Sequence, residues 1–286
     1  PLILPLGISY FVIRIIDTML RWHRGELTEY SLKQFLFFVL FPGTLLAGPI
    51  ETLDNFYKNQ VEKLTRHDFA YGIARILLGL FKKIVLAAYF LSMMQKHYSD
   101  IAALPLDQIN SKEVWEVLFS SLFYAYFDFA GYSDIAIGFS RLMGFRIIEN
   151  FIFPIFAKNL QDFWRRWHRS LSMWSFRNVF FPLVLRWRTP YFPMLLTMVT
   201  IGLWHNLSLS WLTWGLLQGG GLCFLTWKEQ AKQGKPKKSN HIIISSAYRV
   251  IATIITLTFV ALTHSFVLYG DYGTALKVFL AAFHIG

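Results

Sequence analysis

Long apolar runs dominate this sequence and limit what it can fold into. Hydrocarbon offers backbone amides no hydrogen-bonding partner, so a chain that crosses a bilayer needs about 20 apolar residues per crossing, folded as a helix. The runs cover Pro1–Leu20, Leu32–Ile50, Phe69–Met94, Val114–Leu142, Tyr191–Trp204, Leu207–Trp227 and Ile242–Leu268. We therefore expect an all-α fold, a polytopic integral membrane bundle.

The composition supports a membrane protein over the soluble classes. Hydrophobic residues make up 55% and charged residues 16%, against roughly 25% charged in soluble domains. The single cysteine, Cys223, excludes an internal disulfide and any multi-cysteine metal site, and we expect no bound metal or cofactor. The net charge of +11 comes mostly from residues between the apolar runs. This predicts contact with the anionic headgroups of membrane lipids and not with nucleic acid.

Glycine and proline interrupt several runs, at Phe41-Pro42-Gly43, Ala47-Gly48-Pro49 and Ala130-Gly131-Tyr132. A broken helix at membrane depth is tolerated only where it is buried in protein or lines a wet cavity. We therefore expect broken and re-entrant helices around an internal cavity.

Two basic segments suggest an orientation. Lys228–His241 contains five lysines, and Arg186-Trp187-Arg188 is a second basic end. Positive charge favours the cytoplasmic side. The stretch between them is expected to be a hairpin of two short helices, broken near His205-Asn206, with both ends cytoplasmic.

His205 is the one His, Lys, Arg, Asp or Glu residue between Arg188 and Lys228. An ionisable group inside apolar segments is a functional-site hypothesis by default. Apolar surroundings disfavour the imidazolium, so we expect a neutral ring near pH 7 that is able to accept a proton from a hydroxyl. The alternative is a core histidine bonded to a carbonyl at a helix break.

A second cluster runs from Gln161 to Ser172. Trp164, Trp167 and Leu171 fall at helical spacing and predict one apolar face of an interfacial helix. Another face is predicted to carry Arg165, Arg166 and Arg169, with His168 at its edge. This helix would bind the phosphates of a donor such as coenzyme A, or only anchor the chain in lipid.

A third cluster contains Asp128 and Asp134, which flank Gly131 within an apolar run. Carboxylates at this depth need partners. The two side chains are expected to bind a cation, to orient a histidine, or to cap helices at the Gly131 break. They are also candidate substrate-binding residues.

At these motifs the chain resembles the membrane-bound O-acyltransferases, in particular their bacterial branch of alginate O-acetylation, peptidoglycan O-acetyltransferase and D-alanyl transfer proteins. The resemblance extends over nearly the whole chain. It is carried by residues 41–50 (FPGTLLAGPI), 79–84 (GLFKKI), 127–138 (FDFAGYSDIAIG), 162–172 (DFWRRWHRSLS) and 202–206 (GLWHN).

The resemblance implies helices around a tunnel, a catalytic histidine at His205 and a second motif histidine at His168. It also implies transfer of an acyl group, expected to be acetyl, from a cytoplasmic thioester to a hydroxyl. The donor would be acetyl-CoA or an acyl carrier. The acceptor would be an envelope polysaccharide such as alginate, or a periplasmic transferase partner.

We therefore predict an O-acyltransferase of the bacterial inner membrane. Residues 1–286 would form one membrane domain, a fragment without N-terminal helices and the C-terminal end. Trp204 and Asn206 are candidate substrate contacts beside His205. His205 would act as a general base or as a covalent acyl carrier. The other class left open by the residues is a proton-coupled transporter or channel that uses Asp128, Asp134 and His205; a scaffold that recruits a transferase is a third option.

Overall fold

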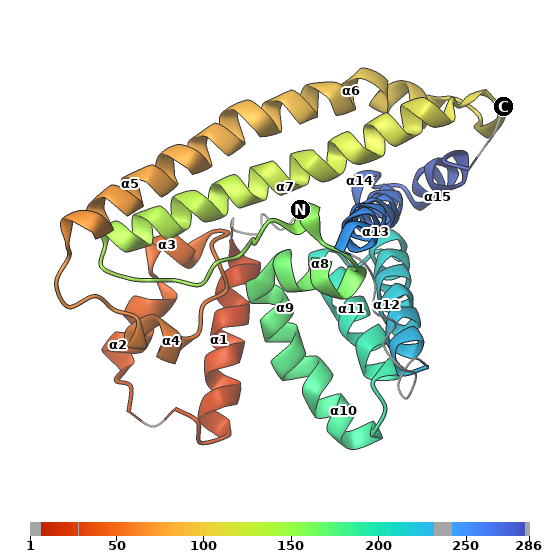
Figure 1. Ribbon diagram of the computed structural model, residues 1–286. Helices are drawn as coiled ribbons and strands as arrows, with labels where there is room; N and C mark the ends of the chain where they lie inside the picture. The colour runs from red at the N-terminus through yellow and green to blue at the C-terminus, as the bar shows by residue number, and fades with distance from the viewer. Residues whose placement is uncertain (1–6, 28, 232–241, 284–286) are drawn as a thin grey trace. The chain divides into compact units, whose positions relative to one another are not determined.

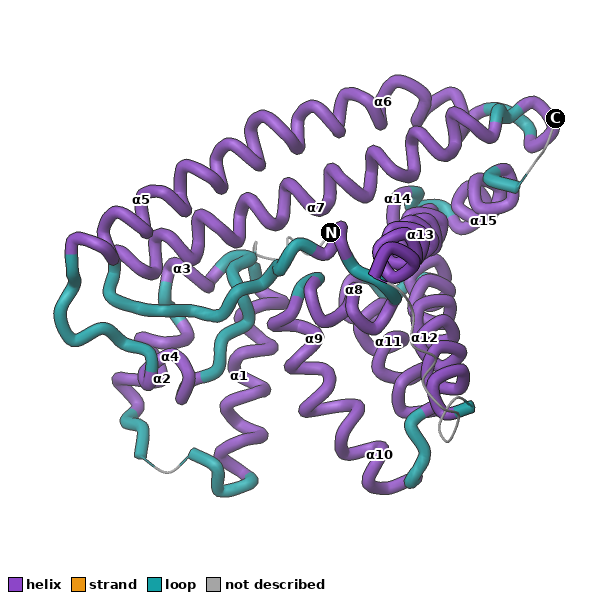
Figure 2. Tube along the Cα trace, in the orientation of Figure 1, coloured by secondary structure: helices purple, strands orange, loops and turns teal. Residues whose placement is uncertain are grey.

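The computed structural model describes residues 7–27, 29–231 and 242–283 (Figure 1). The described residues are mostly helical, and their one isolated β-bridge joins Gln60 and Phe145. The all-α prediction is confirmed. Figure 2 shows the helices and the loops that connect them. The chain packs as two compact units. Unit 1 contains Pro1–Ala87, Tyr126–Ile152 and His168–Trp174, and unit 2 contains Ala88–Ala125, Phe153–Trp167 and Ser175–Gly286.

Unit 1 is built mainly from the N-terminal third of the chain. Ser31 caps α2 through the Gln34 amide, and Thr65 caps α5 through the Asp68 amide; both form reciprocal capping boxes. The helices of unit 1 are α1 (Ile8–His23), α2 (Leu32–Val39), α3 (Pro42–Leu45), α4 (Leu53–Lys58), α5 (Arg66–Phe81), the π-helix η1 (Lys82–Ala87), the C-terminal part of α7 (Ser111–Leu142) and most of α9 (Arg169–Ser175).

Phenylalanine side chains form the centre of unit 1. The rings of Phe56 and Phe145 stack with centroids 4.2 Å apart, and Phe41 meets both rings edge-on at 5.0 and 5.1 Å. Such ring pairs stabilise a core beyond the area that they bury, by about 0.5–1.5 kcal/mol each. This cluster holds the broken segment of α2 and α3 against the chain that follows. The predicted interruption at Pro42 is therefore confirmed.

The predicted break at Gly131 is wrong, because α7 is continuous from Ser111 to Leu142. Gly131 instead permits close contact with α5. A β-carbon on Gly131 would lie 2.7 Å from the Gly79 carbonyl oxygen, and one on Gly79 would lie 2.5 Å from the Gly131 carbonyl oxygen. Gly72 and Gly138 repeat the contact. Within unit 1 the two helices lie side by side (Figure 1).

Unit 2 contains α6, the N-terminal part of α7 and most helices of the second half of the chain. In Figure 1 α11 and α12 lie next to each other, in cyan-green and cyan. The helices of unit 2 are α6 (Ala88–Ala103), η2 (Leu106–Gln108), the N-terminal part of α7, η3 (Pro154–Phe156), α8 (Leu160–Arg166), the π-helix η4 (Phe176–Phe180), α10 (Phe181–Trp187), α11 (Tyr191–His205), α12 (Leu209–Gln230), α13 (Ile242–Thr263), α14 (Ser265–Leu268) and α15 (Tyr272–Ala281).

The predicted hairpin around His205-Asn206 is confirmed. Asn206 is extended, with φ −159° and ψ 134°, and ends α11, while Ser208 caps α12 through the Trp211 amide. Gly202 lets the two helices approach closely, since a β-carbon there would lie 2.4 Å from the Trp211 carbonyl oxygen. The basic loop that should orient this hairpin lies largely outside the described residues, and its cytoplasmic location stays a prediction.

Two of the described helical stretches are long and apolar enough to cross a bilayer. They are Arg66–Ala103, which comprises α5, η1 and α6, and Ala247–Leu268. The other predicted spans fold as shorter, interrupted or less apolar helices; α1 has 16 residues and α11 has 15. The tunnel and the single membrane domain over residues 1–286 stay predictions.

Candidate functional site

His205 is the last residue of α11, at the turn of the hairpin. Its ring stacks on Trp211, with centroids 4.6 Å apart and an interplanar angle of 22°, and Trp204 meets it edge-on at 4.7 Å. The side chains of His205 and Asn206 are exposed. Two indoles therefore fix the plane of the imidazole, while part of the ring remains accessible to a reactant.

A continuous chain of rings connects His205 to α8 within unit 2. Trp211 contacts Trp214 at 5.5 Å, and Trp214 contacts Trp164 of α8 at 5.7 Å. The indole N–H of Trp164 donates to Gln218 Oε1 at 3.1 Å, and Gln218 Nε2 donates to the Thr263 hydroxyl at 2.8 Å. Gln218 is fully buried. These contacts hold α8 against α12 at a fixed position relative to the hairpin.

The predicted helix that carries Trp164, Trp167 and Leu171 on one face is interrupted. Helix α8 ends at Arg166, Trp167 is extended with φ −95° and ψ 129°, and α9 starts at Arg169. The predicted apolar face is therefore wrong, because the backbone leaves helical geometry between its second and third members.

The three arginines of this segment consequently have different surroundings. Arg165 is exposed on α8. Arg166 Nε lies 2.8 Å from Asp162 Oδ1. Arg169 belongs to unit 1 and donates from Nη1 to the Glu149 carbonyl at 3.1 Å. Burial alone would raise the pKa of Asp162, but Arg166 and the Lys158 amide outweigh it and hold the pKa below its usual value. Arg165 is thus the arginine of α8 that faces solvent.

His168 lies in unit 1, between α8 and α9, and is buried with 3% of its surface exposed. Its φ of 41° is left-handed, which is uncommon for a residue other than glycine and costs on the order of 1–3 kcal/mol. The Phe129 ring meets the imidazole edge-on at 4.7 Å, and the Tyr10 ring lies 6.2 Å away. His168 and His205 therefore belong to different units, each with its own aromatic surroundings.

Asp128 and Asp134 form ion pairs and do not cap a helix break. Asp128 pairs with Lys83 of η1, and Asp134 lies 2.5 Å from Lys82 Nζ and also pairs with Arg75. The alternative roles as cation ligands or as partners of a histidine lose their support. These partner cations were not identified from the sequence, although isolated carboxylates in apolar runs require opposite charges.

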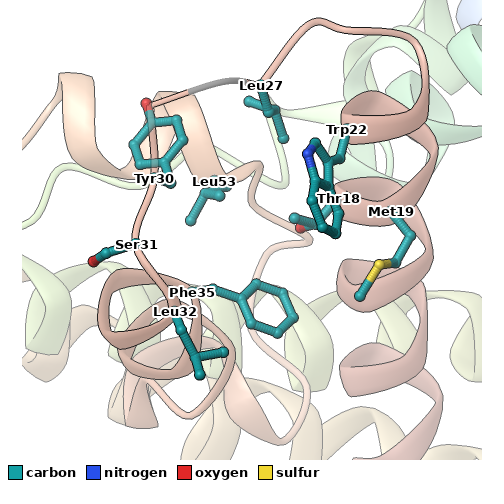
Figure 3. A pocket seen from close by; sticks show the side chains of 9 residues that line it. All are labelled: Thr18, Met19, Trp22, Leu27, Tyr30, Ser31, Leu32, Phe35 and Leu53. Carbon is teal, nitrogen blue, oxygen red and sulfur yellow. The ribbon is translucent and has the colours of Figure 1, made fainter.

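A pocket of about 340 Å³ in unit 1 was not anticipated from the sequence. Figure 3 shows its lining side chains gathered from α1, the following loop, α2 and α4. The walls are mainly apolar and aromatic, with three hydroxyl groups. The lining residues are Thr18, Met19, Trp22, Leu27, Tyr30, Ser31, Leu32, Phe35 and Leu53. None of the predicted site residues is among them.

The part of the chain that the structure describes contains no cluster of metal-ligating side chains. Within residues 7–27, 29–231 and 242–283, no group of three or more His, Cys, Asp or Glu side chains is placed to hold a metal ion. The chemistry available at the hairpin is that of an accessible imidazole, an adjacent amide and two indoles.

Comparison with known proteins assigns the chain to a family. The family model of the membrane-bound O-acyltransferases matches residues 8–245, which include both histidines and every predicted site residue. The chain belongs to the membrane-bound O-acyltransferase family. The resemblance inferred from the motifs is confirmed, as is the coarse assignment to a membrane-associated class of acyl-transferring proteins.

Several curated members of the family are similar to this chain. A probable alginate O-acetylase of Pseudomonas fluorescens is 32% identical over 224 residues, covering 76% of this chain and 44% of that protein. A teichoic acid D-alanyltransferase of Streptococcus thermophilus is 32% identical over 231 residues, covering 76% and 55%. A peptidoglycan O-acetyltransferase of Helicobacter pylori is 29% identical over 309 residues, covering 97% and 56%. The chain thus spans about half the length of these relatives.

Proposed function

We propose that the protein is an O-acyltransferase of the bacterial inner membrane. It transfers an acyl group, in the first instance acetyl, from a cytoplasmic thioester to a hydroxyl of an envelope polysaccharide or of a partner protein. The single observation that carries this proposal is the accessible imidazole of His205 between two indoles, in a chain of the O-acyltransferase family. Relatives named for alginate, teichoic acid and peptidoglycan support an envelope polymer as acceptor.

In the proposed reaction His205 acts as general base. The imidazole takes the proton of the acceptor hydroxyl while the hydroxyl oxygen attacks the thioester carbonyl carbon. The tetrahedral intermediate then expels the thiolate, which takes the proton back from the imidazolium, so that an ester and a free thiol remain. The stacked Trp211 ring fixes the imidazole plane during both proton transfers. An alternative mechanism, in which His205 itself carries the acyl group as a covalent intermediate, uses the same accessible ring.

Neighbouring groups supply the other requirements of the reaction. Stabilisation of the oxyanion needs hydrogen-bond donors, and we assign this role to the Asn206 amide, with the Trp204 indole as a second donor. Arg165, exposed on α8 in the same unit as His205, binds a donor phosphate. Arg166, already paired with Asp162, contributes less. Arg169 faces Glu149 in unit 1 and is assigned to positioning of the polypeptide.

The transporter alternative has less support, because its charged residues have other partners. A proton-coupled carrier needs carboxylates that gain and lose protons during transport. Asp128 and Asp134 are instead paired with Lys83, Lys82 and Arg75. A carrier would have to break these ion pairs in every transport cycle to use either carboxylate.

The test uses the full-length protein in bacterial membranes, supplied with radiolabelled acetyl-CoA. We expect label in envelope polymer from the wild type and none above background from His205→Ala, with equal amounts of both proteins inserted. The matched control is His23→Ala, since His23 is an exposed histidine at the end of α1 and outside the site; it should retain wild-type transfer. Equal transfer by wild type and His205→Ala would refute the role of His205. If neither the wild type nor either variant transfers label, acetyl-CoA is refuted as the donor.

A further inference from the structure

The backbone of His168 needs an external support. Its left-handed φ of 41° is not one that an imidazole-bearing residue prefers, and such conformations persist only where surrounding structure fixes them. Helix α9 begins directly after it, and the Ser172 amide donates to the His168 carbonyl at 3.0 Å. This bond holds the residue from its C-terminal side, within the helix that it starts.

Asn150 supplies support from a different part of the chain. It is fully buried in unit 1. Its carbonyl oxygen accepts from the Arg169 amide at 2.9 Å, and its side-chain oxygen accepts from the Ser170 amide at 3.3 Å and the Ser170 hydroxyl at 2.9 Å. Its side-chain nitrogen donates to the Ser133 hydroxyl of α7 at 3.3 Å. One residue therefore binds both positions that follow His168 and ties them to α7.

The residue before Asn150 anchors this support to an ion-pair network. Arg75 of α5 binds both carboxylate oxygens of Glu149, at 2.6 and 2.9 Å. Arg75 also pairs with Asp134 of α7, whose second oxygen binds Lys82. A bidentate arginine–carboxylate pair defines geometry more strictly than a single bond. Residues 149 and 150 are thus fixed between α5 and α7, the two helices that their glycines bring into close contact.

We propose that Asn150 is a positioning residue for His168 and that the Arg75–Glu149 pair holds Asn150 in place. The proposal rests on the proposed function and adds His168 to it as a second histidine that acyl transfer requires. Asn150 fixes the amides of Arg169 and Ser170, these fix the left-handed turn, and the turn directs the imidazole against Phe129. Removal of the Asn150 side chain lets the turn relax toward ordinary backbone geometry, and the imidazole moves with it.

The experiment compares Asn150→Ala and Asn150→Asp in the full-length protein. A displacement of about 1 Å at a catalytic group costs on the order of 100-fold in rate. We therefore expect kcat of Asn150→Ala to fall about 100-fold while KM for acetyl-CoA stays within twofold. Asn150→Asp should recover much of kcat, because a carboxylate oxygen still accepts from Ser170 and another accepts from the Ser133 hydroxyl. The control Ser140→Ala removes another buried hydroxyl of α7, bonded to the Ala136 carbonyl, and should leave kcat within twofold.

A double-mutant cycle with His168→Ala separates positioning from general stability. If Asn150 acts through His168, adding Asn150→Ala to His168→Ala lowers kcat per folded molecule no further. A second, multiplicative loss, or a kcat for Asn150→Ala within twofold of the wild type, would overturn the proposal. Activity lost in His205→Ala but retained in His168→Ala would overturn it while leaving the proposed function intact.

Amide hydrogen exchange gives a readout that does not depend on transfer. Exchange at the Ser170 amide should be at least about tenfold faster in Asn150→Ala than in the wild type, because this amide loses the side-chain oxygen that accepts from it. The Arg169 amide donates to the backbone carbonyl of residue 150, which the substitution keeps, so it should change less. Ser140→Ala should leave both amides unchanged. Unchanged exchange in Asn150→Ala would overturn the proposal even if the protein transferred no acetyl group.

Discussion

The close contact of α5 and α7 in unit 1 leads to a prediction about a single methyl group. In Gly131→Ala the new β-carbon would lie 2.7 Å from the Gly79 carbonyl oxygen and 3.0 Å from the Lys83 amide nitrogen. Both are backbone atoms, so no side chain can turn aside to make room. The helices must separate, and the separation stretches the ion pairs that Lys82 and Lys83 make with α7.

The expected magnitude follows from two opposing effects. An extra methyl group in a well-packed interior costs typically about 1–3 kcal/mol, and backbone atoms on the other side favour the upper value. Replacing glycine by alanine within a helix gains about 1 kcal/mol. The net destabilisation is therefore about 2 kcal/mol, which lowers Tm by roughly 4–8 °C at about 2–4 °C per kcal/mol for a domain of 150–250 residues.

Thermal unfolding in detergent, at a fixed scan rate, measures this difference. Gly220→Ala is the matched control, because Gly220 also lies within a helix but a β-carbon there would meet no atom within 4 Å. That variant gains helix propensity without a clash, so its Tm should be unchanged or higher. If Gly131→Ala unfolds at or above the Tm of Gly220→Ala, the two helices are not in the close contact described, and the reasoning is refuted.

Two further predictions concern other parts of the chain. Burial raises the pKa of the Asp54 carboxyl, but the Arg21 guanidinium outweighs it and holds the pKa at about 2, below the usual value of about 3.9. The stability from this pair is present above pH ~4 and lost between about pH 4 and 2; the Tm difference between wild type and Asp54→Asn should shrink over that range, and a constant difference would contradict the assignment. Gln218→Leu leaves the Trp164 N–H without its acceptor, which costs about 1–3 kcal/mol and loosens α8. In steady-state assays of this variant, KM for acetyl-CoA should rise several-fold while kcat stays within twofold of the wild type. An unchanged KM would contradict a role of Gln218 in donor binding.

Local signals in the sequence predicted the hairpin at His205 well. Asn206 and Ser208 are a helix-ending and a helix-capping residue in an otherwise apolar stretch, and they act within a few residues of their own positions. The break at Pro42 is local for the same reason, since proline cannot continue a preceding helix. Both features could therefore be predicted without knowledge of tertiary contacts.

Features that depend on distant segments could not be predicted in this way. Gly131 has the same local signal as a helix break, yet its role is set by Gly79, which lies on another helix. The spacing of Trp164, Trp167 and Leu171 is regular, so periodicity alone gave one continuous helix. At the actual interruption the amide and hydroxyl of Ser170 donate to Asn150, and no property of the 161–172 segment reveals these bonds.

The ion pairs of the charged residues could be predicted in part. A carboxylate in an apolar run requires a partner, so the sequence was sufficient to predict that Asp128 and Asp134 are not isolated. Which cations they meet depends on how α5 and η1 align with α7, over separations of 45 and 52 residues. The glycine contacts fix that alignment, and the sequence does not show which glycines face each other.

The ring chain beside His205 has a consequence for the fate of the thioester. Water competes with the hydroxyl acceptor for an activated acyl group. A transferase differs from a thioesterase because only a small fraction of its donor is hydrolysed. The faces of Trp211 and Trp214 offer water no strong hydrogen bond, and the N–H of Trp164 is already bound to Gln218. A water molecule over these ring faces is held only weakly in line for attack. In the proposed reaction the indoles would therefore favour transfer of the acyl group to an acceptor at the open edge of the ring over hydrolysis.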